Sequence, residues 1–264
     1  MLNAKDIHIT FNAGTPIETK ALRGLSLHIP AGQFVTVIGS NGAGKSTLLG
    51  VLSGEVGLQS GQVTIDGTDV SDWSTPRRAG LVARVFQDPM AGTCESLTIE
   101  ENMALASARG RRRGLACAVT GGMQERFEER LSSLGLGLDK RLMDRMGLLS
   151  GGQRQAITLV MATLNPMKIL LLDEHTAALD PKTAAFVMTL TDSIVRQGGL
   201  TTLMVTHSMR QALDYGDRTV MLHEGRVVID VAGDERKGLA VEDLLHMFST
   251  VRGEELSDDA LLLG

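Results

Sequence analysis

A glycine-rich run with one lysine offers the clearest chemistry in this sequence. Its spacing fits G-x-x-x-x-G-K-[ST], the phosphate-binding P-loop, and its residues are Gly39, Ser40, Asn41, Gly42, Ala43, Gly44, Lys45, Ser46 and Thr47. Glycines let backbone N–H groups approach phosphate oxygens, the lysine neutralises the β- and γ-phosphates, and the hydroxyl after it binds Mg²⁺. A chance glycine-rich turn is the alternative, but an apolar run precedes the loop and a helix-compatible run follows it. The motif alone predicts an NTPase or a kinase.

Two consecutive carboxylates follow a second apolar run, residues 168–173. A buried strand there would place Asp173 at its carboxyl end, near the glycine-rich loop, where the carboxylate can hold Mg²⁺ through water. Glu174 would face the γ-phosphate and polarise the attacking water. A buried strand followed by an acidic helix cap is the alternative, and the loop upstream favours the catalytic interpretation.

Apolar runs and helix-compatible stretches supply the framework for these residues. Compact apolar runs suit strands buried on both faces of a parallel sheet, and they occupy residues 34–39, 81–87, 168–173 and 201–207. Helices are expected between them, at residues 45–52 and 181–196. Antiparallel pairing is expected for residues 7–11, 25–29 and 63–65, and for a hairpin of residues 219–223 and 226–231 around Glu224 and Gly225.

Residues 89–166 indicate a helical lobe inserted into this α/β core. Residues 100–108 and 123–134 are its helix candidates, and a Gly/Arg-rich piece separates them. We therefore expect a nucleotide-binding domain over residues 1–232. A tail over residues 233–264 would carry one short amphipathic helix, 241–248, before an acidic and mobile end.

The overall composition excludes several classes of protein. A net charge of −5 and an aromatic content of 3% do not suit a nucleic-acid binder. Cys94 and Cys117 lack metal-like spacing and are expected to be free thiols in a reducing cytosol. The N-terminus has no apolar signal-peptide region, and no stretch approaches the ~18 apolar residues of a membrane helix. A membrane process would therefore need another chain to cross the bilayer.

The run Leu149-Ser150-Gly151-Gly152-Gln153 resembles the LSGGQ signature of ABC ATPases. Other family elements are matched in the family's order: the A-loop aromatic by Phe11, the Q-loop by Gln87, the D-loop by residues 178–180, and the H-loop by His207. The resemblance implies a P-loop NTPase core with a mostly parallel sheet, an N-terminal antiparallel β subdomain and an inserted helical lobe that carries the signature. It also implies ATP and Mg²⁺ as cofactors.

Ser150 is a good N-cap for a helix that runs to Leu164. Gly151 and Gly152 would leave N–H groups exposed at the positive end of that helix, which makes a second anion site. The lobe would carry this site far from the chain's own P-loop. In the family, two subunits pack head to tail, so each ATP lies between one P-loop and the other subunit's Ser150, Gly151, Gly152 and Gln153. A homodimer, or a heterodimer with a related ATPase subunit, is implied.

The resemblance also assigns individual roles. Phe11 would stack on adenine, unless it is a core phenylalanine of an edge strand. Gln87 would contact Mg²⁺ and the attacking water, His207 would contact the γ-phosphate and support Glu174, and Asp180 would reach across the dimer. One departure is visible, because the family commonly has Pro after the catalytic Glu and this chain has His175. Either His175 tunes the pKa of the site or it is a branch-specific substitution, and we prefer the second interpretation.

The expected function is that of an ATP-hydrolysing transporter subunit, peripheral at the cytoplasmic face of the membrane. It would drive separate permease subunits, together with an extracytoplasmic substrate-binding protein, to import a small solute. The run HTAALDPKT resembles an importer branch linked to amino acids. The alternatives are a soluble ABC ATPase acting on the ribosome or DNA, and a phosphotransferase, which would leave LSGGQ without a purpose.

Arg109 and residues 111–113 form a basic cluster. We interpret this cluster as a solvated loop rather than a lipid contact.

Overall fold

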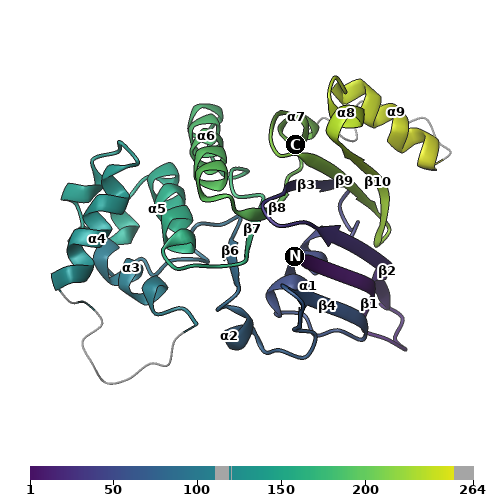
Figure 1. Ribbon diagram of the computed structural model, residues 1–264, viewed down its shortest axis with the longest axis horizontal. Helices are drawn as coiled ribbons and strands as arrows, with labels where there is room; N and C mark the ends of the chain where they lie inside the picture. Colours follow the sequence, from purple (N-terminus) through teal and green to yellow (C-terminus); the bar gives the residue numbers. More distant parts are fainter. Residues whose placement is uncertain (111–118, 120, 253–264) are drawn as a thin grey trace.

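The computed structural model describes residues 1–110, 119 and 121–252. An antiparallel sheet at the N-terminal side has the strand order β2-β1-β4-β5 (Figure 1). Its strands are β1 (Leu2–Phe11), β2 (Thr19–Ile29), β4 (Ser60–Ile65) and β5 (Thr68–Asp69). The predicted antiparallel pairing is confirmed, with Ile9 opposite Leu22 and Ala4 opposite Val63.

The second sheet has the order β10-β9-β3-β8-β7-β6. Its strands are β3 (Phe34–Gly39), β6 (Val82–Val85), β7 (Ile169–Asp173), β8 (Thr201–Val205), β9 (Arg218–His223) and β10 (Arg226–Ala232). All pairs are parallel except the predicted hairpin of β9 and β10. The α/β fold with a mostly parallel sheet is thus confirmed. Because β3, β7 and β8 run in one direction, the loops after them meet at one edge of the sheet, where ligands bind in such folds.

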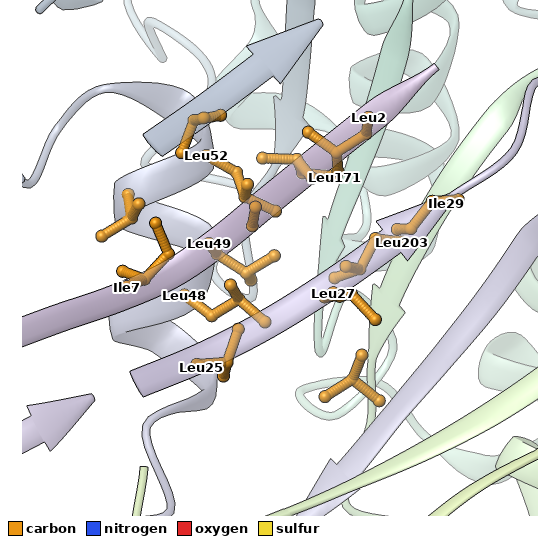
Figure 2. Close-up of a cluster of buried hydrophobic side chains, with 14 of the residues drawn as sticks. Leu2, Ile7, Leu25, Leu27, Ile29, Leu48, Leu49, Leu52, Leu171 and Leu203 are labelled. Carbon is orange, nitrogen blue, oxygen red and sulfur yellow. The ribbon is translucent and has the colours of Figure 1, made fainter. Parts of the chain in front are cut away.

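Helix α1 (Lys45–Ser53) packs with both sheets in one apolar core. Figure 2 shows Leu48, Leu49 and Leu52 of α1 beside the strands that carry Ile7 and Leu25, with side chains of the second sheet next to them. Burying such side chains contributes about 1.5–3 kcal/mol each. The helix that begins at the P-loop lysine is therefore fixed on its apolar face.

The C-terminal end of α1 is held by a buried arginine. Arg78, the last residue of α2 (Thr75–Arg78), donates through Nη1 to the carbonyl oxygens of Val51 and Leu52. Helix ends leave such carbonyls unpaired, and a cation is favourable at the negative end of a helix. Burial lowers the pKa of Arg78. The C-terminal end of α1 is thus positioned before any ligand is considered.

A helical arm extends on the side away from β1 and β2 (Figure 1). It contains α3 (Ile99–Ser107), α4 (Gly121–Ser132), the short 3-10 helices η1 (Leu138–Lys140) and η2 (Met146–Leu148), and α5 (Gly151–Thr163). These elements share an apolar cluster that includes Ile99, Phe127, Leu131 and Ile157. The predicted helices are present within two residues of their expected ends. Arg111–Arg113 and Cys117 lie outside the described residues, whereas Cys94 is a free, exposed thiol.

The remaining helices complete the cover of the second sheet. They are α6 (Pro181–Gly198), α7 (Met209–Asp214), α8 (Gly233–Arg236) and α9 (Val241–Arg252). Helix α9 is longer than expected, and its Leu244 and Phe248 pack against Ile38 and Ile229 of the sheet. The end predicted to be mobile after residue 248 is helical as far as Arg252, residues 253–264 lie outside the described residues, and the division at residue 232 stays a prediction. Within the described part of the chain, no helix is long and apolar enough to span a bilayer.

Candidate functional site

The P-loop follows β3 and leads directly into α1. Gly44 is the N-cap of α1 and makes no side-chain capping bond, so the first N–H groups of the helix are left for another acceptor. Lys45 Nζ donates to the carbonyl oxygens of Gly39 (2.7 Å) and Ser40 (3.2 Å). Burial lowers the pKa of Lys45, while the nearby charges of Glu174 and Asp173 raise it. The ammonium is therefore held by two P-loop carbonyls and lies within the electrostatic influence of both carboxylates.

Glycine is required at two points of this loop by close approach of the backbone. At Gly39, with φ of 153°, an added Cβ would lie 2.3 Å from the carbonyl oxygen of Leu222. At Gly44, with φ of 101°, it would lie 2.6 Å from the carbonyl oxygen of Ala21. The amide N–H of Gly225 also donates to the carbonyl of Ala43. The cradle is thus held by the β9–β10 turn and by β2.

A cavity of about 430 Å³ opens above the P-loop. Residues 41–47 form its floor, and Phe11, Gln87, Glu174 and His207 form its walls together with Thr19 and Ala21. The structure therefore brings together, from five separate segments, most of the residues that the sequence assigned to ATP. Phe11 is 41% exposed at the end of β1, which is not the position of a core phenylalanine.

Glu174 and His207 form a close pair at this cavity, with His207 Nε2 2.7 Å from Glu174 Oε1. The Glu174 side chain is 8% exposed and that of His207 is 38% exposed. Glu174 has a left-handed backbone conformation, φ 45°, which is uncommon for a residue with a side chain. Such strain is often found at functional sites. The pair fits the support of Glu174 by His207 that the sequence led us to expect.

Asp173 has a partner that the sequence analysis missed. Its Oδ2 accepts a hydrogen bond of 2.6 Å from Arg84 Nη2, and Arg84 also pairs with Glu55. The signal that could have identified Arg84 is a lone cation in an otherwise apolar strand, residues 81–87.

The oxygen donors near the P-loop suit Mg²⁺. Ser46 offers a hydroxyl, Gln87 an amide oxygen and Asp173 a carboxylate, and magnesium prefers such oxygen ligands together with substrate phosphates and water. Among the residues that the structure describes, no group of three His, Cys, Asp or Glu side chains could form a metal cage. A metal held mainly by a nucleotide fits this donor set better than a resident structural ion.

The N-cap of the signature helix is built as the sequence predicted, whereas Gly152, expected to be exposed, is buried. Ser150 is the N-cap of α5: its Oγ accepts from Gln153 N at 3.3 Å, and Gln153 Oε1 accepts from Ser150 N at 3.2 Å. Ser150 and Gly151 are exposed. An added Cβ at Gly152 would lie 2.1 Å from Thr183 Cγ2 of α6, so close packing requires glycine there. No signature residue is among the described residues that line the P-loop cavity.

Asp180 caps α6 within its own chain. Its Oδ1 accepts from Thr183 N at 3.1 Å, and hydrogen bonds from Thr183 hold the pKa of Asp180 below its usual range. The carboxylate is exposed. Its expected contact across a dimer is not tested by this chain alone and stays a prediction.

His175 turns away from the P-loop cavity into the core. Its Nε2 lies 2.9 Å from Thr191 Oγ1, which itself lies 2.8 Å from the carbonyl of Val187. Because the single hydroxyl proton of Thr191 goes to that carbonyl, His175 must donate from Nε2. Burial lowers the pKa of His175 to about 4. The side chain is neutral and structural, which favours the substitution interpretation over tuning of the catalytic site.

This burial predicts a pH-dependent stability. The pKa of His175 is about 4 in the native state and about 6.5 when unfolded, so the unfolded chain binds an extra proton between these values. The free energy of unfolding should therefore fall as pH decreases, by about 2 kcal/mol between pH 7 and pH 5 from this group. Urea titrations of wild type and His175→Leu measure it. Parallel pH profiles of the two proteins would contradict it.

Comparison with known proteins agrees with this geometry. A family model described as ABC transporter matches residues 22–177. A tyrosine transport ATP-binding protein of Clostridioides difficile is 46% identical over 248 residues, which cover 94% of this chain and 98% of that protein. An aliphatic sulfonates import ATP-binding protein of Agrobacterium fabrum is 33% identical over a region that covers 81% of this chain and 74% of that protein.

Solved structures share the fold. An ATP-binding cassette determined as a dimer in a post-hydrolysis state, bound to ADP and Pi, has a TM-score of 0.74 at 29% identity, covering 88% of this chain and 98% of that one. The family model spans more than half of the sequence, and the clostridial relative matches nearly all of it. The chain therefore belongs to the ABC transporter family and is an ATP-binding cassette ATPase.

Proposed function

We propose that this chain is the ATPase subunit of an importer for a small, amino-acid-like solute. The observation that carries the catalytic part is the Glu174–His207 pair, 2.7 Å apart, at the wall of the cavity whose floor is the P-loop. Two relatives, a tyrosine transport protein and an aliphatic sulfonates import protein, support the importer assignment, and the first supports the choice of solute class.

In this proposal the P-loop binds the phosphates of ATP. The N–H groups at the start of α1 point toward the cavity, and Lys45 exchanges the carbonyls of Gly39 and Ser40 for the β- and γ-phosphate oxygens. Phe11 stacks on the adenine ring from the end of β1. Bound Mg²⁺ supplies charge neutralisation of the phosphates; Ser46, Gln87 and Asp173 are the residues that would hold it.

Glu174 acts as general base in hydrolysis. It accepts a proton from water while the water oxygen bonds to the γ-phosphorus, and the bond from that phosphorus to the β–γ bridging oxygen breaks to give ADP and phosphate. His207 keeps the Glu174 carboxylate in place through their close contact, 2.7 Å between Nε2 and Oε1, and contacts the γ-phosphate. Gln87 orients the water from the loop after β6.

A second subunit completes the site. Ser150, Gly151, Gly152 and Gln153 do not line this chain's own cavity, and the exposed start of α5 is suited to an anion. Two copies, or this chain and a related ATPase subunit, would pack head to tail so that each signature faces the partner's P-loop. Asp180 lies next to that interface, and the solved relative that is dimeric with ADP and Pi supports such an arrangement.

A permease would dock in a groove between the helical arm and the core. The groove has a volume of about 1160 Å³, and Cys94, Leu105 and Met161 are among its lining residues. Leu105 is 43% exposed there, so an apolar cytoplasmic segment of the permease would cover it. The chain would then lie at the cytoplasmic face of the membrane, and an extracytoplasmic binding protein would deliver the solute.

Recovery of the complex from native cells tests this proposal. We expect a tagged wild-type chain, purified in a gentle detergent, to bring down a multi-span permease. Leu105→Glu should reduce the recovered permease at least about tenfold because it buries a charge in the contact, while ATP binding is kept. The matched control is Ile17→Glu, which places the same charge at another exposed aliphatic residue, in the loop between β1 and β2. Ribosomal or DNA-bound proteins without a permease would instead support the soluble alternative.

A further inference from the structure

Arg84 is a cation inside an otherwise apolar strand. In the parallel register of β6 and β7, Arg84 is opposite Leu171. Side chains alternate between the faces of a strand, so Asp173, two residues after Leu171, lies on the same face as Arg84. Strand pairing therefore places a guanidinium beside the carboxylate that we assign to Mg²⁺.

The contacts of Arg84 form a three-residue chain. Nη2 donates to Asp173 Oδ2 at 2.6 Å and Nη1 donates to Glu55 Oε2, while the Arg84 side chain is only 12% exposed. Glu55 follows α1 and is the more exposed carboxylate, at 39% against 13% for Asp173. The guanidinium also lies over the ring of Phe86, with Cζ 4.8 Å from its centroid. Arg84 is thus shared between a buried and a more open carboxylate.

Two cations would compete for Asp173. A guanidinium that is hydrogen-bonded to Asp173 Oδ2 occupies a lone pair that water bound to Mg²⁺ would use, and it repels a divalent ion through a region of reduced dielectric. Glu55 gives Arg84 a second acceptor at the opposite end of its planar fork. Weakening the bond to Asp173 would therefore not leave Arg84 buried and unpaired.

We propose that Arg84 is a positioning residue that competes with Mg²⁺ for Asp173 and thereby sets the metal affinity of the nucleotide site, with Glu55 as the alternative acceptor. This inference rests on the proposed function, in which Asp173 serves the metal. Arg84 holds Asp173 in place before Mg²⁺ arrives, and it shifts toward Glu55 when the metal is present. Release of Mg²⁺ with the product is favoured by the same competition.

A purely structural role for the three residues makes a different prediction. If Arg84 only ties β6 to β7 and to the end of α1, then removing Arg84 and removing the charge of Glu55 should disturb the site in the same direction. Competition requires opposite directions. Arg84→Met removes the competitor and tightens Mg²⁺ binding, whereas Glu55→Gln removes the alternative acceptor and weakens it.

The test measures Mg²⁺ binding without turnover. The full chain is titrated with Mg²⁺ in the presence of a fluorescent ADP analogue, and the half-saturating Mg²⁺ concentration is read from the fluorescence. We expect Arg84→Met to lower that concentration about 5–10-fold and Glu55→Gln to raise it about threefold. Arg84→Lys keeps the cation and should lie nearer to wild type than to Arg84→Met. Arg141→Met, which removes the arginine of the Arg141–Asp144 pair in the helical arm, should leave the concentration unchanged.

Each outcome decides a separate question. Asp173→Asn should abolish the Mg²⁺ dependence, and if it does not, or if wild-type ADP binding ignores Mg²⁺, the metal site of the proposed function is wrong. If wild type and Asp173→Asn behave as expected, an unchanged or weaker Mg²⁺ affinity in Arg84→Met overturns the competition alone. Should Arg84→Met fail to fold, Glu55→Gln still decides, because unchanged or tighter Mg²⁺ binding in that variant contradicts the proposal.

Discussion

Glu174→Gln is expected to bind ATP and to hold two subunits together while hydrolysis falls at least about 100-fold. An amide of the same shape keeps the contact with His207 Nε2, 2.7 Å away in the wild-type protein, but it cannot accept the proton of the attacking water. General base catalysis contributes about 10²–10⁴-fold in rate. Phosphate release measures the loss, and size-exclusion chromatography with and without ATP measures the dimer.

Two controls separate the chemistry from the architecture of the site. Glu18→Gln removes an exposed carboxylate of the loop between β1 and β2 and should leave hydrolysis unchanged. His207→Ala removes the support of Glu174 and should lower hydrolysis without preventing ATP binding. Near-normal turnover in Glu174→Gln would remove Glu174 from its proposed role, and loss of ATP binding in that variant would show that the carboxylate serves the ground state instead.

Local chemistry made much of this site predictable from the sequence. The capping box of α5 needs only Ser150 and Gln153, three residues apart, and the P-loop needs glycines at fixed spacing before a helix. Both are decided by hydrogen bonds between near neighbours, which a single sequence records. The positions of the strands and the β9–β10 hairpin were predictable for a related reason, because the apolar runs and the Glu224-Gly225 turn are local signals.

Contacts between distant segments could not be predicted in the same way. Arg84 meets Asp173, 89 residues later, because the register of two parallel strands places them side by side, and no single-sequence pattern fixes that register. His175 follows the catalytic Glu174, yet its side chain enters the core beside Thr191 of α6. The left-handed φ of Glu174 sets the direction of the backbone at this point. As a result, Glu174 lines the P-loop cavity while His175 enters the core. The packing of α9 through Leu244 and Phe248 on Ile38 of β3 and Ile229 of β10 is likewise a contact between distant segments.

A mixed dimer is expected to show whether the nucleotide site is shared between subunits. Ser150→Arg places a bulky cation at the N-cap of α5, removes its capping box and should abolish ATP-dependent pairing of that signature. Lys45→Ala removes the ammonium of the P-loop. In a dimer of one Ser150→Arg subunit and one Lys45→Ala subunit, the intact P-loop of the first faces the intact signature of the second. Both lesions fall in the other site, so one complete site remains.

The matched control carries the same two substitutions in a different distribution. When one chain bears both Lys45→Ala and Ser150→Arg and its partner is wild type, each site contains one lesion and no complete site remains. With Glu174→Gln in every chain to prevent turnover, and a different tag on each subunit, purified mixed dimers should retain about one ATP in the first arrangement and about none in the second. A site contained within one chain predicts no intact site in the first arrangement, where each chain carries one of the two lesions, and one intact site in the second, where the partner chain carries neither. The two models thus give opposite orders of ATP retention, and the order alone decides whether the exposed end of α5 serves the partner's P-loop.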